Sequence, residues 1–570
     1  VFGAVGHVVV SAGSPDRLGM KWHGSVYLVA LAAGSLSCTF VFGSSRPCHR
    51  SHWGRPREPS RLRGTVEVAS FGDEGALEVA PWNFTVFGLI FVALTLAAAA
   101  LQRARPRPRP TSSRPPEGPG VVELLADLRN AWKQETWAKD HGKIFETWTP
   151  FASVVCLSDP TASRYIAVKK GNNYREPCVY GRDLRLSERI EDALGPGSSF
   201  PTFEAWRWRK QSLQGELSFQ RLLKSPEVLE TLVDLGDEMC NTLDFAAAHG
   251  HVIRMNEIFS RATAGAVFHL LFGRRLDFDS IKLEESTQEV MECLDGLLMP
   301  FHLPGQKDEL LAKRGHAHSI IDAVVEPELR LLLEEVRSGH RGDTHRAPAL
   351  LEAMLKKEPR WREAKFENLL AEVRNFVNAG YEIQAFSLSF ALGFLAEPRH
   401  RPLAEKTRQE AVAIMKSGFE SKSLLTKTES MQAIFNEAVR LLPPTPMLTG
   451  VAYDDFEVAV DGRNYSIAKD TTLNFQVFAG QRSSDFGKCP RQFDPERWEG
   501  LKSSKLMTYN FGAHSCPGRD MSSLEARVWI PMLLSRFRFE LDSDLEDVEV
   551  DSSGLHLKPK DGLKLQVFKC

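Results

Sequence analysis

Residues 508–519 read TYNFGAHSCPGR, and the run DMSSLEARVWIPMLLSRF that follows is typical of a helix. One cysteine, Cys516, stands between Gly512 and Gly518 directly before that helix. A helix N-terminus lowers the pKa of a nearby thiol, and a thiolate is a strong ligand for soft metals. The two glycines would let the loop approach a flat cofactor, with the histidine and the arginine supplying positive charge. Alone, the stretch fits a ligand cysteine and a buried structural cysteine equally well.

The composition excludes several classes of protein. The chain has 570 residues, 43% of them hydrophobic, so it can bury a large core. Lys and Arg number 71 against 73 Asp and Glu, a formal net charge of -2, and no basic field points to nucleic acid as a partner. The nine cysteines form no CxxC pair. This spacing argues against a disulfide framework and a zinc site, and it favours a reducing compartment.

The N-terminal part has the composition of targeting and anchoring sequence. Residues 1–44 resemble a signal peptide that would start at Met20, and 45–81 form an arginine-rich segment. The uncharged run WNFTVFGLIFVALTLAAAAL spans about 30 Å as a helix and predicts a transmembrane anchor over 82–102. Residues 103–120 alternate Pro with Arg and predict a stiff hinge.

The same segments predict a location. Arginines directly after the apolar run favour a single pass with the C-terminal part on the cytosol-like side. The order of signal peptide, arginine-rich segment and second apolar span also resembles the bipartite presequences of complex plastids. A plain endoplasmic reticulum anchor is the alternative, and both readings predict a membrane protein.

Residues 121–570 are predicted to form one mainly α-helical domain with small β-sheets. The segment 201–440 carries mostly helical patterning, and the longest predicted helix runs from about Ala364 to Ala396, before Pro398. At about 50 Å it would cross the whole domain. Short apolar runs such as FEVAV and TTLNFQVF after residue 440 predict strands.

Three further motifs accompany the cysteine stretch. Glu437 and Arg440 lie three residues apart on a predicted helix, where they could form a charge-assisted pair. The run FDPERW offers Arg497 as a third charged partner about twenty residues before the cysteine. The run NAGYE, 378–382, puts Gly380 in the middle of the long helix. Glycine there costs about 1 kcal/mol relative to alanine, which indicates that something approaches the backbone.

Together and in this order, the motifs resemble the cytochrome P450 family in its membrane-anchored eukaryotic type. The resemblance covers about 121–570. The family's F-x-x-G-x-x-x-C-x-G loop is matched from Tyr509 to Gly518 with tyrosine in place of phenylalanine. Its W-x-x-x-[RK], A-G-x-[DE]-T, E-x-x-R and P-E-R-F motifs correspond to residues 206–210, 379–383, 437–440 and 495–498, with isoleucine in place of the threonine and tryptophan in place of the phenylalanine. The resemblance implies a P450 fold with a long central helix over the haem.

The resemblance also implies roles for individual residues. Cys516 would be the axial thiolate of heme b (iron protoporphyrin IX), a ligand that favours O–O cleavage. The other cofactor-binding residues would be His514, Trp206, Lys210, Gly512, Gly518 and Tyr509. The oxygen groove, which carries the candidate catalytic residues, would comprise Ala379, Gly380, Glu382 and Ile383. A structural charge cluster behind the haem would comprise Glu437, Arg440 and Arg497.

Two positions depart from the family pattern. Thr449-Gly450 stands where the family usually has an arginine after the PPxP turn, so one propionate contact is missing or supplied elsewhere. Ile383 stands where the family usually has the groove threonine, which helps to deliver protons.

The resemblance implies a haem-thiolate monooxygenase that inserts one atom of O2 into an apolar small molecule. Its electrons would come from an NADPH-dependent reductase or a ferredoxin. One alternative is a haem-thiolate isomerase or dehydratase that acts on hydroperoxides and needs neither O2 nor electrons. A catalytically silent haem-binding protein is the other alternative.

Overall fold

The structure is a computed structural model. It describes residues 113–127, 130–149, 153–168, 179–181, 187–195, 203–213, 215–298, 305–339, 347, 349–541, 550–551 and 556–570. The predicted signal peptide, arginine-rich segment, anchor and most of the hinge lie outside these residues. Among the helices that the structure does describe, none is long and apolar enough to cross a bilayer.

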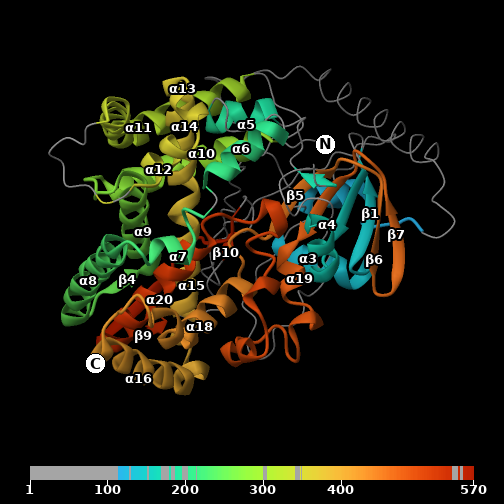
Figure 1. Ribbon diagram of the computed structural model, residues 1–570. Coiled ribbons are helices and arrows are strands. Elements are labelled where there is room, and N and C mark those ends of the chain that lie inside the picture. The colour runs from blue at the N-terminus through green and yellow to red at the C-terminus, as the bar shows by residue number, and fades with distance from the viewer. Residues whose placement is uncertain are drawn as a thin grey trace, which may run out of the picture. The chain divides into compact units, whose positions relative to one another are not determined.

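The described part is mainly helical with small sheets, as predicted (Figure 1). The α-helices are α2 Val121–Asp127, α3 Ala131–His141, α4 Pro160–Val168, α5 Ser187–Leu194, α6 Phe203–Leu213, α7 Phe219–Leu222, α8 Pro226–His249, α9 Met255–Phe272, α10 Ser280–Leu297, α11 Gln306–Ser338, α12 Leu350–Lys357, α13 Pro359–Glu363, α14 Phe366–Gly380, α15 Glu382–Ala396, α16 Arg401–Ser417, α17 Leu424–Lys427, α18 Glu429–Leu441, α19 Val477–Gln481 and α20 Arg519–Arg536.

The strands form four small sheets. Their bounds are β1 Ile144–Trp148, β2 Ser153–Leu157, β3 Tyr180–Gly181, β4 Val252–Arg254, β5 Met447–Ala452, β6 Phe456–Val460, β7 Arg463–Ile467, β8 Thr472–Gln476, β9 Phe537–Leu541, β10 Val550–Asp551, β11 Lys558–Pro559 and β12 Lys564–Lys569. The largest sheet has the order β1-β2-β8-β5-β3, and the others are β4-β12-β9, β6-β7 and β10-β11. In the largest sheet β2 and β8 run parallel, so segments more than 300 residues apart lie side by side.

The long helix predicted from Ala364 to Ala396 is interrupted. Helix α14 ends at Gly380 and α15 begins at Glu382, because Tyr381 adopts φ −116° and ψ −55° and leaves the helical path. The Tyr381 ring is 1% exposed, and its hydroxyl bonds the hydroxyl of Thr287 and the carbonyl of Leu283 on α10. A buried tyrosine needs a partner for its hydroxyl, and α10 supplies it at the break. The predicted stop before Pro398 is confirmed.

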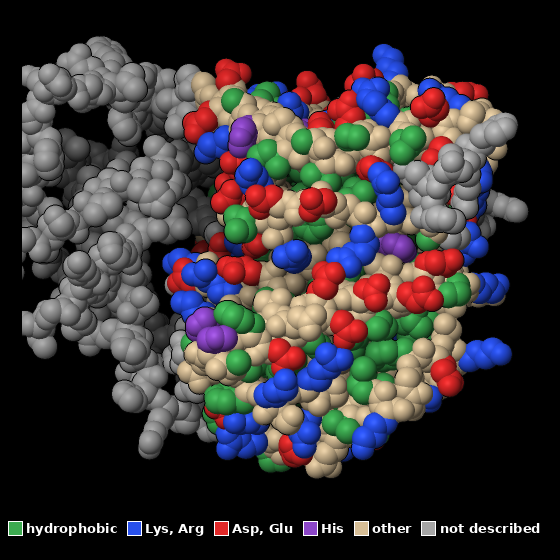
Figure 2. Space-filling model, turned by 90° about the vertical axis from the view of Figure 1, so that its left-hand side faces the viewer, with side chains coloured by type: hydrophobic (Ala, Val, Ile, Leu, Met, Phe, Trp, Pro, Cys, Tyr) green, Lys and Arg blue, Asp and Glu red, His purple; other side chains and the backbone are tan. Residues whose placement is uncertain are grey.

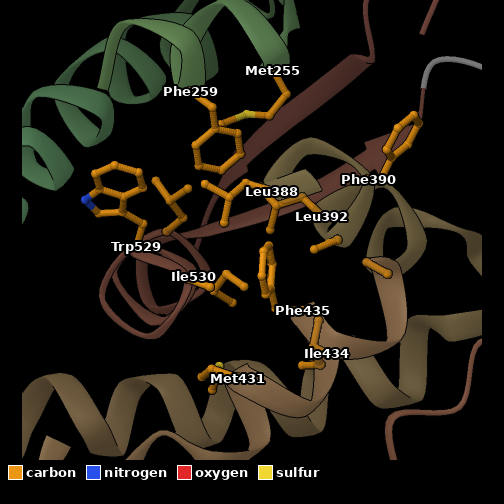
Figure 3. Packing of buried hydrophobic residues seen from close by; sticks show 14 of the residues in the cluster. Met255, Phe259, Leu388, Phe390, Leu392, Met431, Ile434, Phe435, Trp529 and Ile530 are labelled. Atoms are coloured by element: carbon orange, nitrogen blue, oxygen red, sulfur yellow. The ribbon is translucent and has the colours of Figure 1, made fainter. Parts of the chain in front are cut away.

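The main hydrophobic core joins helices from distant parts of the chain. Phe435 of α18 lies among Leu388 of α15, Phe259 of α9 and Ile530 of α20 (Figure 3). These side chains are almost completely removed from water, and each such burial contributes about 1.5–3 kcal/mol. The core thereby fixes α15 and α20, the two helices that carry the site.

The surface carries mixed charge. On the face shown in Figure 2, Lys and Arg side chains are interspersed with Asp and Glu side chains. This face therefore has no extended field of one sign, in line with the near-zero net charge of the sequence.

Candidate functional site

Cys516 lies in the loop between the short 3-10 helix Gly512–His514 and α20. Its backbone N–H donates to the carbonyl of Tyr509 at 2.8 Å, which closes the loop. The side chain is accessible, although protein atoms surround it closely. Burial therefore raises the pKa of the thiol, while the N–H groups of Gly518 and Arg519 and the charge of Lys210 lower it. The start of α20 lowers the pKa of the thiol, as the sequence predicted, but burial is the larger effect.

The donor set around this thiol restricts what it can hold. Among the described residues, no group of three His, Cys, Asp or Glu side chains could hold a bare metal ion. Cys516 would thus bind only a metal that brings its other ligands with it, as haem iron does. A coordinating metal also removes the proton from a thiol whose pKa burial has raised. The accessible single cysteine fits a haem.

The two glycines of the loop have different surroundings. Gly512 has φ +61°, and a Cβ there would lie 2.6 Å from the carbonyl oxygen of Ala167 on α4. A side chain at 512 is excluded by α4, so the close approach made by this glycine is to a helix. At Gly518 a Cβ would meet only the sulfur of Cys516, at 3.8 Å. Gly518 therefore leaves one side of the thiol uncovered.

Lys210 and His514 both lie at the loop. The ammonium of Lys210, on α6, donates to the carbonyl of Ser515, and burial lowers its pKa while the charge of Cys516 opposes this shift. The His514 ring packs edge-to-face on Tyr180, with 5.7 Å between ring centroids. Trp206 also lies on α6, but its side chain falls outside the described residues.

Tyr180 is a site residue that sequence reasoning missed. It belongs to the two-residue strand β3, which is too short to give a periodic signal. Its strand pairs with β5, and a Cβ at Gly450 would lie 2.5 Å from the carbonyl oxygen of Gly181. The glycine found in place of the family's arginine therefore makes room for β3, and β3 brings the Tyr180 ring to His514.

The predicted oxygen groove is marked by accessible residues on an otherwise buried helix. Ile383 is the one residue of α15 that is not buried. Ala379, four residues earlier and thus on the same face, is exposed. Gly380 points elsewhere, since a Cβ there would lie 2.7 Å from Val267 of α9. The missing side chain of Gly380 thus accommodates α9, which is the backbone approach that the sequence predicted.

Glu382 is a buried carboxyl that has no hydrogen bond within the part of the chain that the structure describes. It is 5% exposed, and burial raises its pKa to about 7. Lys558 opposes this shift, whereas Glu284 and Glu292 of α10 add to it. A carboxyl with this pKa is protonated in about half of the molecules at neutral pH.

A polar link joins α15 to the cysteine loop. The Gln384 amide N–H donates to the Ser522 carbonyl at 2.9 Å, and the Ser522 hydroxyl donates to the Gln384 amide oxygen at 2.6 Å. The hydroxyl of Tyr509 bonds the Ser522 hydroxyl at 3.1 Å. This contact explains the tyrosine in place of the family's phenylalanine, because only tyrosine can make it.

The predicted charge cluster is assembled. The Arg440 guanidinium donates from Nε and Nη2 to the two Glu437 oxygens at 2.8 and 2.7 Å, and both side chains are 0% exposed. Arg497 donates to the same carboxylate at 2.8 Å, and the Trp498 indole N–H adds a bond at 3.0 Å. Sequence reasoning missed Trp498, because its indole N–H has no counterpart in the phenylalanine of the family motif.

Comparisons with known proteins agree with this geometry. The family model described as Cytochrome P450 matches residues 121–567. A cytokinin hydroxylase of Arabidopsis thaliana is 22% identical over 75% of this chain and 82% of its own length. The Arabidopsis thaliana protein LUTEIN DEFICIENT 5, chloroplastic, is 24% identical over 75% and 72%. A beta-amyrin 11-oxidase of Glycyrrhiza uralensis is 24% identical over 56% and 66%.

Proposed function

The chain belongs to the cytochrome P450 family, and on this basis we propose that it oxidises an apolar small molecule above Cys516 with electrons from an NADPH-dependent reductase or a ferredoxin. The family and the hydroxylases and oxidases among the relatives make the protein a monooxygenase, an oxidoreductase that uses haem and a redox partner. The observation that carries the proposal is the accessible thiol of Cys516 in a P450 domain.

The residues present fit a haem of the heme b type. Cys516 would hold its iron, while Lys210 and His514 stand beside the loop to meet its acidic groups. When bound, haem supplies the iron at which O2 is reduced so that one oxygen atom enters the substrate and the other leaves as water. The protein residues orient the substrate, hold the thiolate and move protons.

A direct experiment tests this function. Holoprotein is incubated with candidate apolar compounds, with NADPH and a reductase, under labelled O2. We expect one labelled oxygen atom in the product. Product formed from a hydroperoxide without reductase and without label would instead assign the protein to the isomerase or dehydratase class.

The location that we propose is a membrane, reached through the anchor at 82–102. The support is the uncharged run in the sequence, followed by arginines. Endoplasmic reticulum and plastid are both compatible with the targeting segments, and one relative is named as chloroplastic.

Deleting residues 1–102 is expected to release a soluble domain that still carries haem, because the predicted catalytic domain begins at about residue 121. Fractionation of membranes and supernatant, together with the absorption of bound haem, checks this. Full-length protein is the control and should sediment with membranes. Sedimentation of the truncated protein would require a further membrane contact, and loss of haem would move the domain boundary.

Ile383 bears on how efficiently the protein uses its electrons. It lies on the accessible face beside Ala379 and has no hydroxyl to pass a proton. The Gln384 amide is engaged by Ser522, so the Glu382 carboxyl is the neighbouring group that could still carry a proton. We propose that the oxidation runs with loss of reducing equivalents as peroxide.

Ile383→Thr should therefore raise the product formed per NADPH consumed. Positioned proton transfer typically contributes about 10²-fold or more to a rate, and the variant should recover part of that. Ile383→Val is the matched control, because valine has the shape of threonine without its hydroxyl. Equal coupling in both variants, or nearly complete coupling in the wild type, would refute a proton-delivery defect.

A further inference from the structure

A row of polar side chains follows the central helix next to the accessible groove. Asn375, Asn378 and Glu382 are spaced i, i+3 and i+7, which places them on one face. The spacing continues across the break because the Ala385 N–H already bonds the Tyr381 carbonyl at 2.9 Å. The row spans about 10 Å of helix and borders the face of Ala379 and Ile383.

The members of this row lack partners. Asn378 is 6% exposed, and within the described ranges neither its amide oxygen nor its amide nitrogen has a hydrogen-bond partner. The side-chain oxygen of Asn375 is buried without a partner as well. Glu382 is buried and has no hydrogen bond among the described residues. Buried polar groups are nearly always paired in folded proteins, so the unpaired side-chain atoms of Asn375 and Asn378, next to the Glu382 carboxyl, need an external explanation.

Packing does not supply that explanation. Three neighbours of the row in sequence have partners of their own: Tyr381 bonds α10, Gly380 packs on Val267, and Arg374 donates from Nε to Asp322 of α11 at 2.6 Å. A side chain needed only to fill space would be apolar at these positions, since an unpaired buried amide costs stability. Two amides and a carboxyl kept beside the groove indicate a ligand that completes their bonds.

The surroundings of Glu382 indicate the chemistry of that ligand. Burial is the main cause of the raised pKa of Glu382; among the charged neighbours Lys558 has the largest effect and lowers this pKa, while Glu284 and Glu292 raise it. The same burial disfavours a charged ligand group, so a neutral polar group fits this place better. A hydroxyl donates to the amide and carboxyl oxygens of the row and accepts from the Asn378 N–H.

We propose that Asn375, Asn378 and Glu382 form a recognition row for a hydroxyl group of the substrate, so that the substrate class is an apolar molecule that already carries a hydroxyl. The claim that the bound molecule is the substrate rests on the proposed function. The claim that the row binds a hydroxyl rests on its unpaired groups alone. The row selects substrates that carry a hydroxyl and orients them. It contacts the substrate at this hydroxyl and not at the bond that reacts.

Matched probes test the row without turnover. The holoprotein is dialysed to equilibrium against 1-dodecanol, dodecane and dodecanoate, which share an apolar chain and differ in the end group. We expect wild type to bind the alcohol at least about tenfold more tightly than the other two, the gain typical of one buried polar group that finds its partner. Asn378→Leu should remove this preference and leave dodecane binding unchanged. No preference in the wild type, or equal losses for all probes, would overturn the proposal.

A stability measurement separates recognition from a structural role. Asn256 is also 6% exposed, but its side-chain oxygen accepts from the Leu563 N–H at 3.0 Å. Thermal unfolding without probe should show a lower Tm for Asn256→Leu and an unchanged or higher Tm for Asn378→Leu. A loss of Tm in Asn378→Leu as large as in Asn256→Leu would make Asn378 structural. If the wild type prefers the alcohol but forms no labelled product in the incubations with candidate compounds, the recognition row is supported and the proposed monooxygenation is refuted.

Discussion

Replacing Cys516 by serine is expected to abolish the thiolate-type carbon monoxide spectrum of the reduced protein. A serine oxygen is a hard ligand and remains protonated at neutral pH, so it cannot replace the electron-rich sulfur. Among the described residues no second cysteine lies in a loop of this kind, and three of the other five are buried in the core. The measurement is the difference spectrum of the reduced protein with and without carbon monoxide.

Cys570→Ser is the matched control, since Cys570 is also accessible but lies at the C-terminus. Its spectrum should equal that of the wild type. An unchanged spectrum in the Cys516→Ser protein would refute the assignment of this residue as the ligand, whatever the turnover of the variant.

The second large effect is expected at Glu437. Glu437→Ala strands the guanidinium of Arg440, which is 0% exposed, and removes the acceptor of Arg497. Breaking one partner of a buried pair costs about 3–5 kcal/mol, a large part of a domain stability of about 5–15 kcal/mol. We expect little folded protein with bound haem, measured as the yield of holoprotein and its thermal unfolding.

An exposed pair provides the control for this variant. Glu405 and Arg408 have the same i,i+3 spacing on α16, and their side chains are 47% and 28% exposed. Glu405→Ala should leave the thermal unfolding nearly unchanged, because solvent screens such pairs. A well-folded, haem-loaded Glu437→Ala protein with reduced turnover would contradict the structural role.

Motif spacing predicted the parts of the fold that rest on local sequence. The mainly helical class, the helix after Cys516 and the stop before Pro398 follow from periodicity and from proline, and the structure confirms them. The meeting of Glu437 with Arg497 needs a contact across sixty residues. The FDPERW motif identified Arg497 as a third charged partner, but periodicity alone places a side chain on a face of its own helix and names no partner.

Other features were beyond any local signal. The break at Tyr381 depends on its hydroxyl reaching α10, and nothing near residue 381 encodes that partner. The role of Gly450 depends on a two-residue strand 270 residues earlier. The net rise in the pKa of Cys516 depends on how densely protein surrounds the thiol, which a helix N-terminus alone does not reveal.

The C-terminal strand has a consequence for how the protein is made. β12 lies between β4 and β9 and pairs Lys564 with Arg254. The sheet that packs on α8 is therefore complete only when residues 564–569 have been made. Domains fold as units, and contacts between distant segments form late. While the ribosome is still adding these residues, β4 lacks its partner strand β12, and α20 has only begun to leave the ribosome. A nascent chain stalled before residue 564 should therefore carry no haem, because β12 has not yet joined β4 and β9.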